Sequence, residues 1–315
     1  MRLIRTLAAR RAVLVVVLGA GVLTAIVVLA AMAASGGSSG KALPITAAVP
    51  AVKPGSDYLA IGDSVAFGFR EPTTVPAPDY HDAASFVGYP EDVAAELHLH
   101  VTNASCPGET SASLINASAQ SNGCENSITA SGKRIGLGYR TAFPLHVSYR
   151  QSQLAFALAF LKTHPKTRLV SLMIGANDAF ICEDTTADHC IAPRQLDPVL
   201  ASVTRNVGII LAAIRTKAQY RGQIVIVNYY SLNYANAFDN AASHALNSAV
   251  DAGARPYRVE IAHGYQAFAA AATYSGNDSC TAGLLTQLST GGCGVHPSPS
   301  GQSVLAEAVD AAVTP

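Results

Sequence analysis

Four short stretches of this sequence carry residue types that together could perform acyl transfer. They are Gly62-Asp63-Ser64, Gly108, Asn177 within a Gly-Ala-Asn-Asp run, and His296 before a proline. A serine hydroxyl can act as a nucleophile, a neutral imidazole can take its proton, and N–H groups can stabilise the oxyanion that forms. Each stretch alone is weak evidence, because these residue types also cap helices and form turns. Their order and the structure expected before each one make the set specific.

The first three stretches each follow, directly or through a loop, an apolar run that is typical of a buried strand. Short apolar runs alternate with longer amphipathic ones, which predicts a parallel sheet with crossover helices. Such sheets bind ligands at the carboxyl ends of their strands, where these three stretches would lie. The expected strands are 58–62, 99–103, 168–174, 223–229 and 258–262, and the expected helices are 83–97, 151–163, 196–220, 237–252 and 300–313.

Within this arrangement each candidate residue has a chemical role. Ser64 is the candidate nucleophile, at a sharp turn that Gly62 permits. The backbone N–H groups of Ser64 and Gly108 and the side-chain amide of Asn177 would form the oxyanion hole, each donor stabilising the transition state by about 3 kcal/mol. His296, in a glycine-rich turn before the last helix, is the candidate general base.

The composition suits one large domain and argues against a polyanionic partner. The chain has 315 residues, and 50% of them are hydrophobic, which is enough for a substantial core. Only 13% are charged, and 21 basic residues balance 21 acidic ones. Because no basic field results, we expect no binding of nucleic acid.

The N-terminal residues 1–40 have the pattern of a targeting segment. Four arginines precede an uncharged apolar run at 12–34, and Ala31-Met32-Ala33 resembles a cleavage site. We expect an export signal, with an uncleaved membrane anchor as the alternative because the run approaches the length of a bilayer span. In both cases the domain at 56–315 would lie outside the cytoplasm, either secreted or anchored to the outer face of the cytoplasmic membrane. Residues 41–55 would be a linker.

The six cysteines all follow this segment, and an even number in an exported chain predicts disulfides. Sequence alone leaves many pairings open. We favour the sequential pairing Cys106–Cys124, Cys182–Cys190 and Cys280–Cys293, because it closes three short surface loops. Zinc is the competing interpretation, but the chain lacks the Cys-x-x-Cys and His-x₃-His spacings that a zinc site favours.

The four stretches resemble the blocks of the GDSL/SGNH hydrolase family. Ser64 matches its first block, Gly108 the second, Asn177 the third and His296 the fifth, and the likeness extends from about residue 58 to the C-terminus. The resemblance implies an α/β class three-layer α/β/α flavodoxin-like (SGNH hydrolase) fold with a central parallel sheet, no metal, no cofactor, and ester hydrolysis through an acyl-serine intermediate. The cysteines and the targeting segment are most similar to those of secreted actinobacterial esterases and lipases.

One position departs from the family pattern. The last block usually carries an aspartate three residues before the histidine, and this chain has Cys293 there. A thiol or a half-disulfide cannot replace a carboxylate. We therefore expect a Ser64–His296 dyad in which a backbone carbonyl accepts the imidazole N–H. A displaced acid is the alternative, and Asp278 is the nearest one that precedes His296 in the sequence.

The expected function is a secreted serine esterase or lipase acting on carboxylic esters, including lipid esters. One alternative is a carbohydrate or cell-envelope acyl-ester hydrolase, such as a deacetylase, on the same machinery. Another is a non-catalytic binding protein on the same fold, which Cys293 would explain. The expected partner is a small-molecule or lipid ester. We expect a monomer, with membrane association only through the N-terminal segment.

Overall fold

Five short aliphatic runs form one parallel sheet, and their order confirms the expected fold class. The strands are β1 (Asp57–Gly62), β2 (His100–Asn103), β5 (Thr167–Met173), β6 (Gln223–Val227) and β7 (Glu260–Ala262). They lie in the order β2-β1-β5-β6-β7, and every neighbouring pair is parallel. Counted within this sheet, this is the 2-1-3-4-5 order of flavodoxin-like folds. The carboxyl ends of β1, β2 and β5 therefore meet at one edge.

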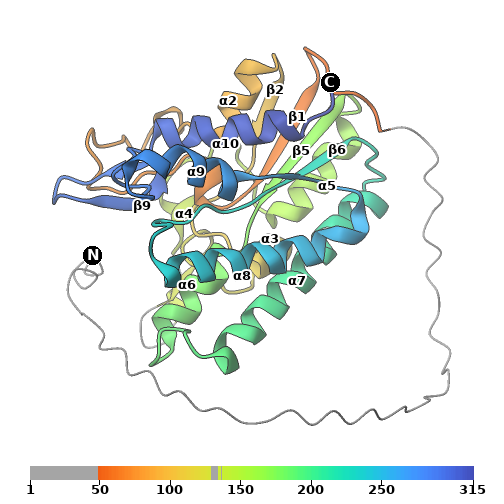
Figure 1. Cartoon of the computed structure of the whole chain (residues 1–315). Coiled ribbons are helices and arrows are strands. Elements are labelled where there is room, and N and C mark those ends of the chain that lie inside the picture. Colours follow the sequence, from red (N-terminus) through yellow and green to blue (C-terminus); the bar gives the residue numbers. More distant parts are fainter. Residues whose placement is uncertain (1–48, 129–133, 136) are drawn as a thin grey trace, which may run out of the picture. The chain divides into compact units, whose positions relative to one another are not determined.

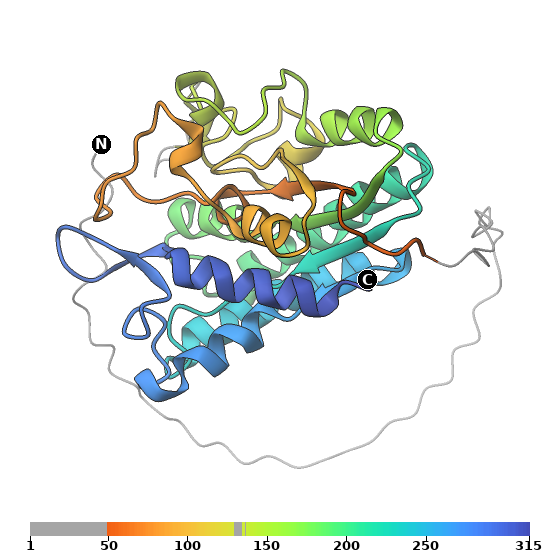
Figure 2. The same cartoon turned by 90° about the horizontal axis from the view of Figure 1, so that it is seen from above.

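Helices cover both faces of the sheet and complete the three layers (Figure 1). One layer contains α2 (Tyr89–Glu96), α9 (Gly264–Ala272) and α10 (Pro299–Ala312), and α10 packs on both of the others. The opposite layer contains α3 (Ser111–Ile115), α5 (Gln153–Thr163), α7 (Pro193–Thr216) and α8 (Ala237–Ala254). Figure 2 shows the same sheet from above, with α10 running along it.

Helix α7 is the one described helix that is long and apolar enough, by length and composition alone, to cross a membrane. Six of its residues are buried in the core of the domain, including Val203, Val207 and Ile210. Its remaining faces are polar or partly exposed, as in an amphipathic helix packed on a sheet. We therefore interpret α7 as a core helix.

The structure is a computed structural model that describes residues 49–128, 134–135 and 137–315. The expected export signal or anchor at 1–40 and linker residues 41–48 lie outside the described residues. The other described elements are the helices α1 (Ser64–Phe67), α4 (Tyr139–Ala142) and α6 (Ala176–Thr185), the short 3-10 helices η1 (Ala83–Ser85), η2 (Arg255–Tyr257) and η3 (Thr273–Ser275), and the strand pairs β3 (Ser127–Ile128) with β4 (Arg134–Ile135) and β8 (Leu285–Gln287) with β9 (Cys293–Pro297).

Two sequence-based expectations about local structure are wrong. The helix expected at 83–97 splits into η1 and α2, because Pro90 is tolerated only in the first turn of a helix, so α2 must begin at Tyr89. His296 lies in β9 of an antiparallel hairpin and not in an irregular turn. The glycines that suggested a turn form the tip of this hairpin, where Gly291 and Gly292 have positive φ.

The six cysteines form three disulfides in the described chain. They pair Cys106 with Cys124, Cys182 with Cys190, and Cys280 with Cys293. This is the sequential pairing that the sequence analysis favoured. The first bridge closes the loop after β2, the second joins α6 to the segment before α7, and the third ties β9 to the segment after η3.

A buried amide holds the end of β1, where the chain turns toward Ser64. Gln153 is fully buried, and its Oε1 accepts a hydrogen bond from Gly62 N at 2.6 Å. Its Nε2 donates to Gly62 O at 3.0 Å and to Glu109 Oε2 at 3.0 Å. One side chain from α5 thus satisfies the peptide groups at the strand end and also links them to the loop after β2.

We expect Gln153→Leu to lower the free energy of unfolding by about 2–4 kcal/mol, because it leaves Gly62 N–H and Glu109 Oε2 without this partner in a buried site. Urea denaturation would measure the loss. Gln151→Leu is a matched control, since Gln151 is exposed, and we expect a change within about 0.5 kcal/mol. Equal effects of the two substitutions would contradict the role given to Gln153.

Candidate active site

Ser64 lies at the start of helix α1, directly after β1. Asp63 is the N-cap of α1, and its Oδ1 accepts a hydrogen bond from Val65 N at 3.0 Å. Its Oδ2 accepts from the hydroxyl of Tyr229. Burial raises the pKa of Asp63 to about 6, although the Tyr229 and Val65 hydrogen bonds lower it. The capping role considered for Asp63 is therefore real, and it leaves Ser64 as the first residue of the helix.

The hydroxyl of Ser64 and the ring of His296 are in hydrogen-bond contact. His296 Nε2 lies 2.9 Å from Ser64 Oγ, although the two residues are far apart in the sequence. The other ring nitrogen, Nδ1, lies 2.7 Å from Oε1 of Glu71. Serine, histidine and carboxylate thus form a continuous hydrogen-bonded chain, which is the arrangement of a serine hydrolase triad.

The expectation of a Ser64–His296 dyad without a carboxylate is therefore wrong. The acceptor for His296 Nδ1 is the Glu71 carboxylate and not a backbone carbonyl. Asp278, the displaced acid that was considered, accepts instead from Asn233 Nδ2 and from the backbone N of Thr281. The Cys280–Cys293 bridge does lie at the start of β9, but the acid reaches His296 from the segment after α1.

The Glu71 carboxylate also holds the backbone of β9. Oε1 accepts from Val295 N at 2.9 Å, and Oε2 accepts from Thr286 Oγ1 at 2.6 Å. Gly294 has no side chain where a Cβ would overlap the carboxylate, so glycine permits this close approach. Glu71 therefore joins the N-terminal part of the domain to the β8–β9 hairpin that carries His296.

The charge state of Glu71 settles the tautomer of His296. Burial by itself would raise the pKa of Glu71, but the hydrogen bond and charge of His296, together with Thr286, outweigh burial and lower it to about 2. An ionised carboxylate only accepts hydrogen bonds, so Nδ1 of His296 must carry the proton that points to Glu71. When Nε2 is unprotonated, its lone pair faces the hydroxyl of Ser64.

The loop that carries Gly108 contacts the end of β1 through Cys106. Cys106 N donates to Gly62 O at 3.2 Å. Gly108 has a φ of 81°, a conformation that favours glycine, and a Cβ there would lie 2.6 Å from the carbonyl oxygen of Asn122. Glycine is thus required at this position for both conformation and packing.

Asn177 lies in the first turn of α6 and binds the same loop. Its Nδ2 donates to Glu109 O at 3.0 Å, and its Oδ1 accepts from Asn122 Nδ2 at 3.0 Å. The neighbouring Asp178 accepts from both Ser111 N and Ser111 Oγ, at 2.8 and 2.6 Å. The second and third stretches are therefore fastened to each other by their side chains.

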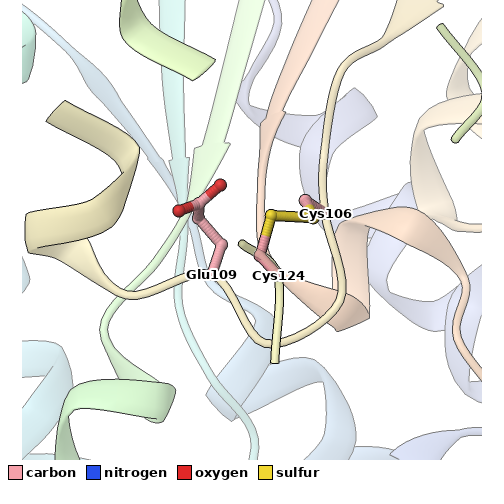
Figure 3. Close-up of side chains that lie close together, drawn as sticks. All are labelled: Cys106, Glu109 and Cys124. Atoms are coloured by element: carbon pink, nitrogen blue, oxygen red, sulfur yellow. A yellow bond between two sulfur atoms is a disulfide. The ribbon is translucent and has the colours of Figure 1, made fainter. Parts of the chain in front are cut away.

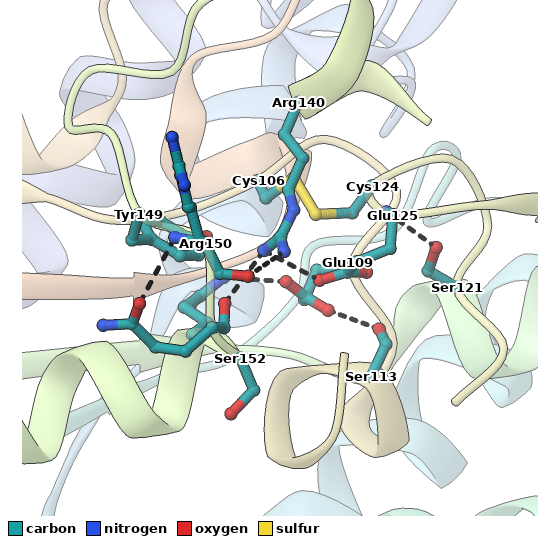
Figure 4. Close-up of polar contacts among 12 residues, drawn as sticks. Cys106, Glu109, Ser113, Ser121, Cys124, Glu125, Arg140, Tyr149, Arg150 and Ser152 are labelled. Carbon is teal, nitrogen blue, oxygen red and sulfur yellow. Dashed lines mark hydrogen bonds and ion pairs between the residues drawn. A yellow bond between two sulfur atoms is a disulfide. The ribbon is translucent and has the colours of Figure 1, made fainter. Parts of the chain in front are cut away.

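Cys106, Glu109 and Cys124 form a buried cluster next to Gly108. The three lie close together, as Figure 3 shows, but the two sulfur atoms are joined to each other and offer no thiolate to a metal. Figure 4 shows the polar contacts around them, in which Arg140 pairs with Glu125 at 3.3 Å. Burial, followed by the charge of Glu125, raises the pKa of Glu109 well above its usual range.

Glu71 is not among the residues expected from the sequence. An acid was expected close to His296, because the resembled family carries one there. The only available signal was an acidic residue shortly after Ser64, in the run Phe69-Arg70-Glu71-Pro72. Nothing in that run distinguishes Glu71 from an ordinary surface glutamate, so only the tertiary contact identifies it.

We expect the stabilising effect of Glu71 to disappear in acid. Its pKa is about 2 in the folded state and near the model-compound value of 4.5 when unfolded, so its contribution is complete above about pH 4.5 and is lost as the pH falls toward 2. Unfolding free energies of the native chain and Glu71→Gln, measured from pH 6 to pH 3, should converge at low pH. Asp63, whose pKa is raised, affects the stability of both proteins in the opposite direction as the pH falls. Its effect cancels when the unfolding free energy of one protein is subtracted from that of the other. A gap that stays constant would contradict the lowered pKa.

Comparisons with known proteins identify the family and agree with the fold. The sequence model of the GDSL-like Lipase/Acylhydrolase family matches residues 60–304. No curated protein sequence matches the chain. In fold it is similar to phospholipase A1 from Streptomyces albidoflavus, with 19% identity over 82% of this chain and 100% of that one and a TM-score of 0.50.

Two further solved structures show a weaker likeness. The lipase Lip_vut3 from a goat rumen metagenome has 14% identity, covering 82% of this chain and 97% of that one, with a TM-score of 0.48. Acetylxylan esterase Axe2 from Geobacillus stearothermophilus has 18% identity, covering 82% and 94%, with a TM-score of 0.45. The family match spans most of the chain, and with it the segments that bear Ser64, Glu71 and His296. The chain therefore belongs to the GDSL-like lipase/acylhydrolase family and is a hydrolase of ester bonds.

Proposed function

We propose that this protein hydrolyses carboxylic esters with a Ser64–His296–Glu71 triad. The observation that carries the proposal is the hydrogen-bonded chain from Ser64 Oγ through both nitrogens of His296 to Glu71 Oε1. The backbone N–H groups of Ser64 and Gly108 and the Asn177 amide would supply the oxyanion hole. A binding protein without turnover loses its only support, because Glu71 provides the carboxylate that Cys293 cannot.

In the first half-reaction the Ser64 oxygen attacks the ester carbonyl carbon while His296 Nε2 takes the hydroxyl proton. The carbonyl π electrons move onto the oxygen, and the oxyanion accepts hydrogen bonds from the three proposed donors. Glu71 stabilises the imidazolium and keeps its ring in place. The tetrahedral intermediate then expels the alkoxide, which receives the proton from His296 and leaves as the alcohol.

In the second half-reaction water replaces the alcohol. His296 takes one proton from the water as its oxygen attacks the acyl-serine carbonyl. The second tetrahedral intermediate breaks the bond to Ser64, and the proton returns to the serine oxygen. The products are the carboxylic acid and the regenerated triad. No metal or redox partner is needed to balance these steps.

An aromatic cluster beside His296 supports an apolar substrate. The ring of Phe69 is half-buried and lies edge-on to the His296 ring, with 4.9 Å between centroids. Phe69 in turn contacts Tyr80 and Tyr139 at 5.8 and 6.0 Å. Aromatic surface next to the base would favour the burial of an acyl or alcohol chain. The full cluster contains Phe67, Phe69, Tyr80, Phe86, Tyr139, Phe143 and Leu145.

We also propose that the domain acts outside the cytoplasm as a monomer. Support comes from the three disulfides, because such bridges persist in oxidising compartments and are rare in reducing ones. The balanced charge of the chain gives no reason to expect a polyanionic partner. Secretion and membrane anchoring would differ only in whether the N-terminal segment is retained.

We expect Ser64→Ala to lower kcat on p-nitrophenyl esters by at least ~10⁴-fold, because no other group would form the acyl intermediate. Acyl chains from acetyl to palmitoyl should be tested on the oxidised protein, and we expect a preference for chains longer than acetyl. Ser303→Ala, at an exposed position on α10, is the matched control and should retain full activity. An active Ser64→Ala protein would refute the nucleophile. Turnover of acetylated glycans, with none on these esters, would favour a deacetylase.

We expect Glu71→Gln to lower kcat by about 10²- to 10⁴-fold, because an amide can present an N–H to His296 and favour the wrong tautomer. Asp278→Asn is the matched control: it removes the nearest carboxylate that precedes His296 in the sequence, which binds Asn233 instead, and should change kcat less than twofold. Circular dichroism would verify folding of both. A larger loss of kcat in Asp278→Asn than in Glu71→Gln would indicate that Asp278 is the acid of the triad.

A further inference from the structure

Asn122 contacts both loop elements that would stabilise the oxyanion. It lies in the loop closed by the Cys106–Cys124 bridge. Its backbone N donates to Gly108 O at 2.7 Å, and its side-chain Nδ2 donates to Asn177 Oδ1 at 3.0 Å. A single residue thus binds one proposed donor through its backbone and another through its side chain.

Two contacts, to the Glu109 carbonyl and to the Asn122 side chain, hold the Asn177 amide in one orientation. Asn177 is 5% exposed, and its Nδ2 donates to Glu109 O at 3.0 Å while its Oδ1 accepts from Asn122. If the amide were turned over, Nδ2 would face the Nδ2 of Asn122 and Oδ1 would face the Glu109 carbonyl. Both contacts would then be repulsive. In the observed orientation one Nδ2 hydrogen of Asn177 is donated to Glu109 O, and the second can be donated to another acceptor.

The backbone contact holds the peptide group that joins Gly108 to Glu109. The Gly108 carbonyl accepts from Asn122 N, while the backbone of Asn122 and Gly123 packs where a Cβ of residue 108 would lie. A peptide held in this way cannot rotate without losing the hydrogen bond. Asn122 therefore limits the motion of the turn that would present the Gly108 N–H.

We infer that Asn122 is a positioning residue that orients the Asn177 amide, and with it the oxyanion hole, for the transition state. The inference rests on the proposed function and adds a residue that neither the sequence motifs nor the triad includes. Asn122 does not itself touch the ester. It acts through Asn177, so its contribution should exist only while the Asn177 side chain is present.

A double-mutant cycle on kcat for a p-nitrophenyl ester tests this dependence. We expect Asn177→Ala to lower kcat by about 10²- to 10³-fold, as for loss of one oxyanion donor. Asn122→Ala keeps the backbone contact to Gly108 and should lower kcat by about 10-fold, with KM changed less than about twofold. The double variant should be no slower than Asn177→Ala alone. Asn116→Ala, an exposed asparagine in the same loop, is the matched control and should be fully active.

Asn122→Asp gives a second test with a side chain of the same shape. Its carboxylate oxygen would face Asn177 Oδ1 and favour the reversed amide, so we expect a greater loss of kcat than with Asn122→Ala. Additive losses in the cycle, or an unchanged kcat in Asn122→Ala while Asn177→Ala is impaired, would overturn the inference alone. An unimpaired Asn177→Ala would overturn the proposed oxyanion hole together with it.

Discussion

The carboxylate of Glu71 binds the imidazole of His296 and the backbone of the strand that carries it. Thr286 and Val295 donate to the same carboxylate, so one buried anion holds the β8–β9 hairpin against the segment that follows Ser64. Taking a carboxylate out of water is costly unless each oxygen finds donors, and here the donors are the parts that the site needs in position. The position of the hairpin and the tautomer of His296 depend on this one group.

On the opposite side of the site, two residues likewise hold the loops through more than one hydrogen bond each. The amide of Gln153 satisfies the peptide groups of Gly62 and reaches Glu109, and Asn122 joins Gly108 to Asn177. Each contact links the end of one strand to the loop of another. Since buried donors and acceptors are expensive to leave unpaired, these links make the relative positions of the loops nearly rigid. Preorganised donors stabilise a developing charge without reorganisation during the reaction.

Much of this could be predicted because it depends on local pattern. The strands β1, β5 and β6 are aliphatic runs whose ends are recognisable within one or two residues, and their parallel pairing follows from the alternation with helices. Ser64, Gly108, Asn177 and His296 were recognisable because each occupies a characteristic short motif. The sequential disulfides were favoured because they close short loops. The break before α2 depended on Pro90 and was recognised only in the structure.

The sequence by itself determined the fold class, the turn that holds Ser64, the candidate base His296 and the order of the loops, since these follow from periodicity and from motifs a few residues long. The tertiary structure alone decided which carboxylate contacts His296 and which side chain contacts the Asn177 amide. Glu71 and Asn122 stand in unremarkable surroundings in the sequence, and Asp278 seemed the nearer acid. Their contacts join segments that are distant along the chain, through hydrogen bonds whose partners exist only after the sheet brings the loops together. A carboxylate is recognised by the distance to its partner in space, and separation along the chain does not report that distance.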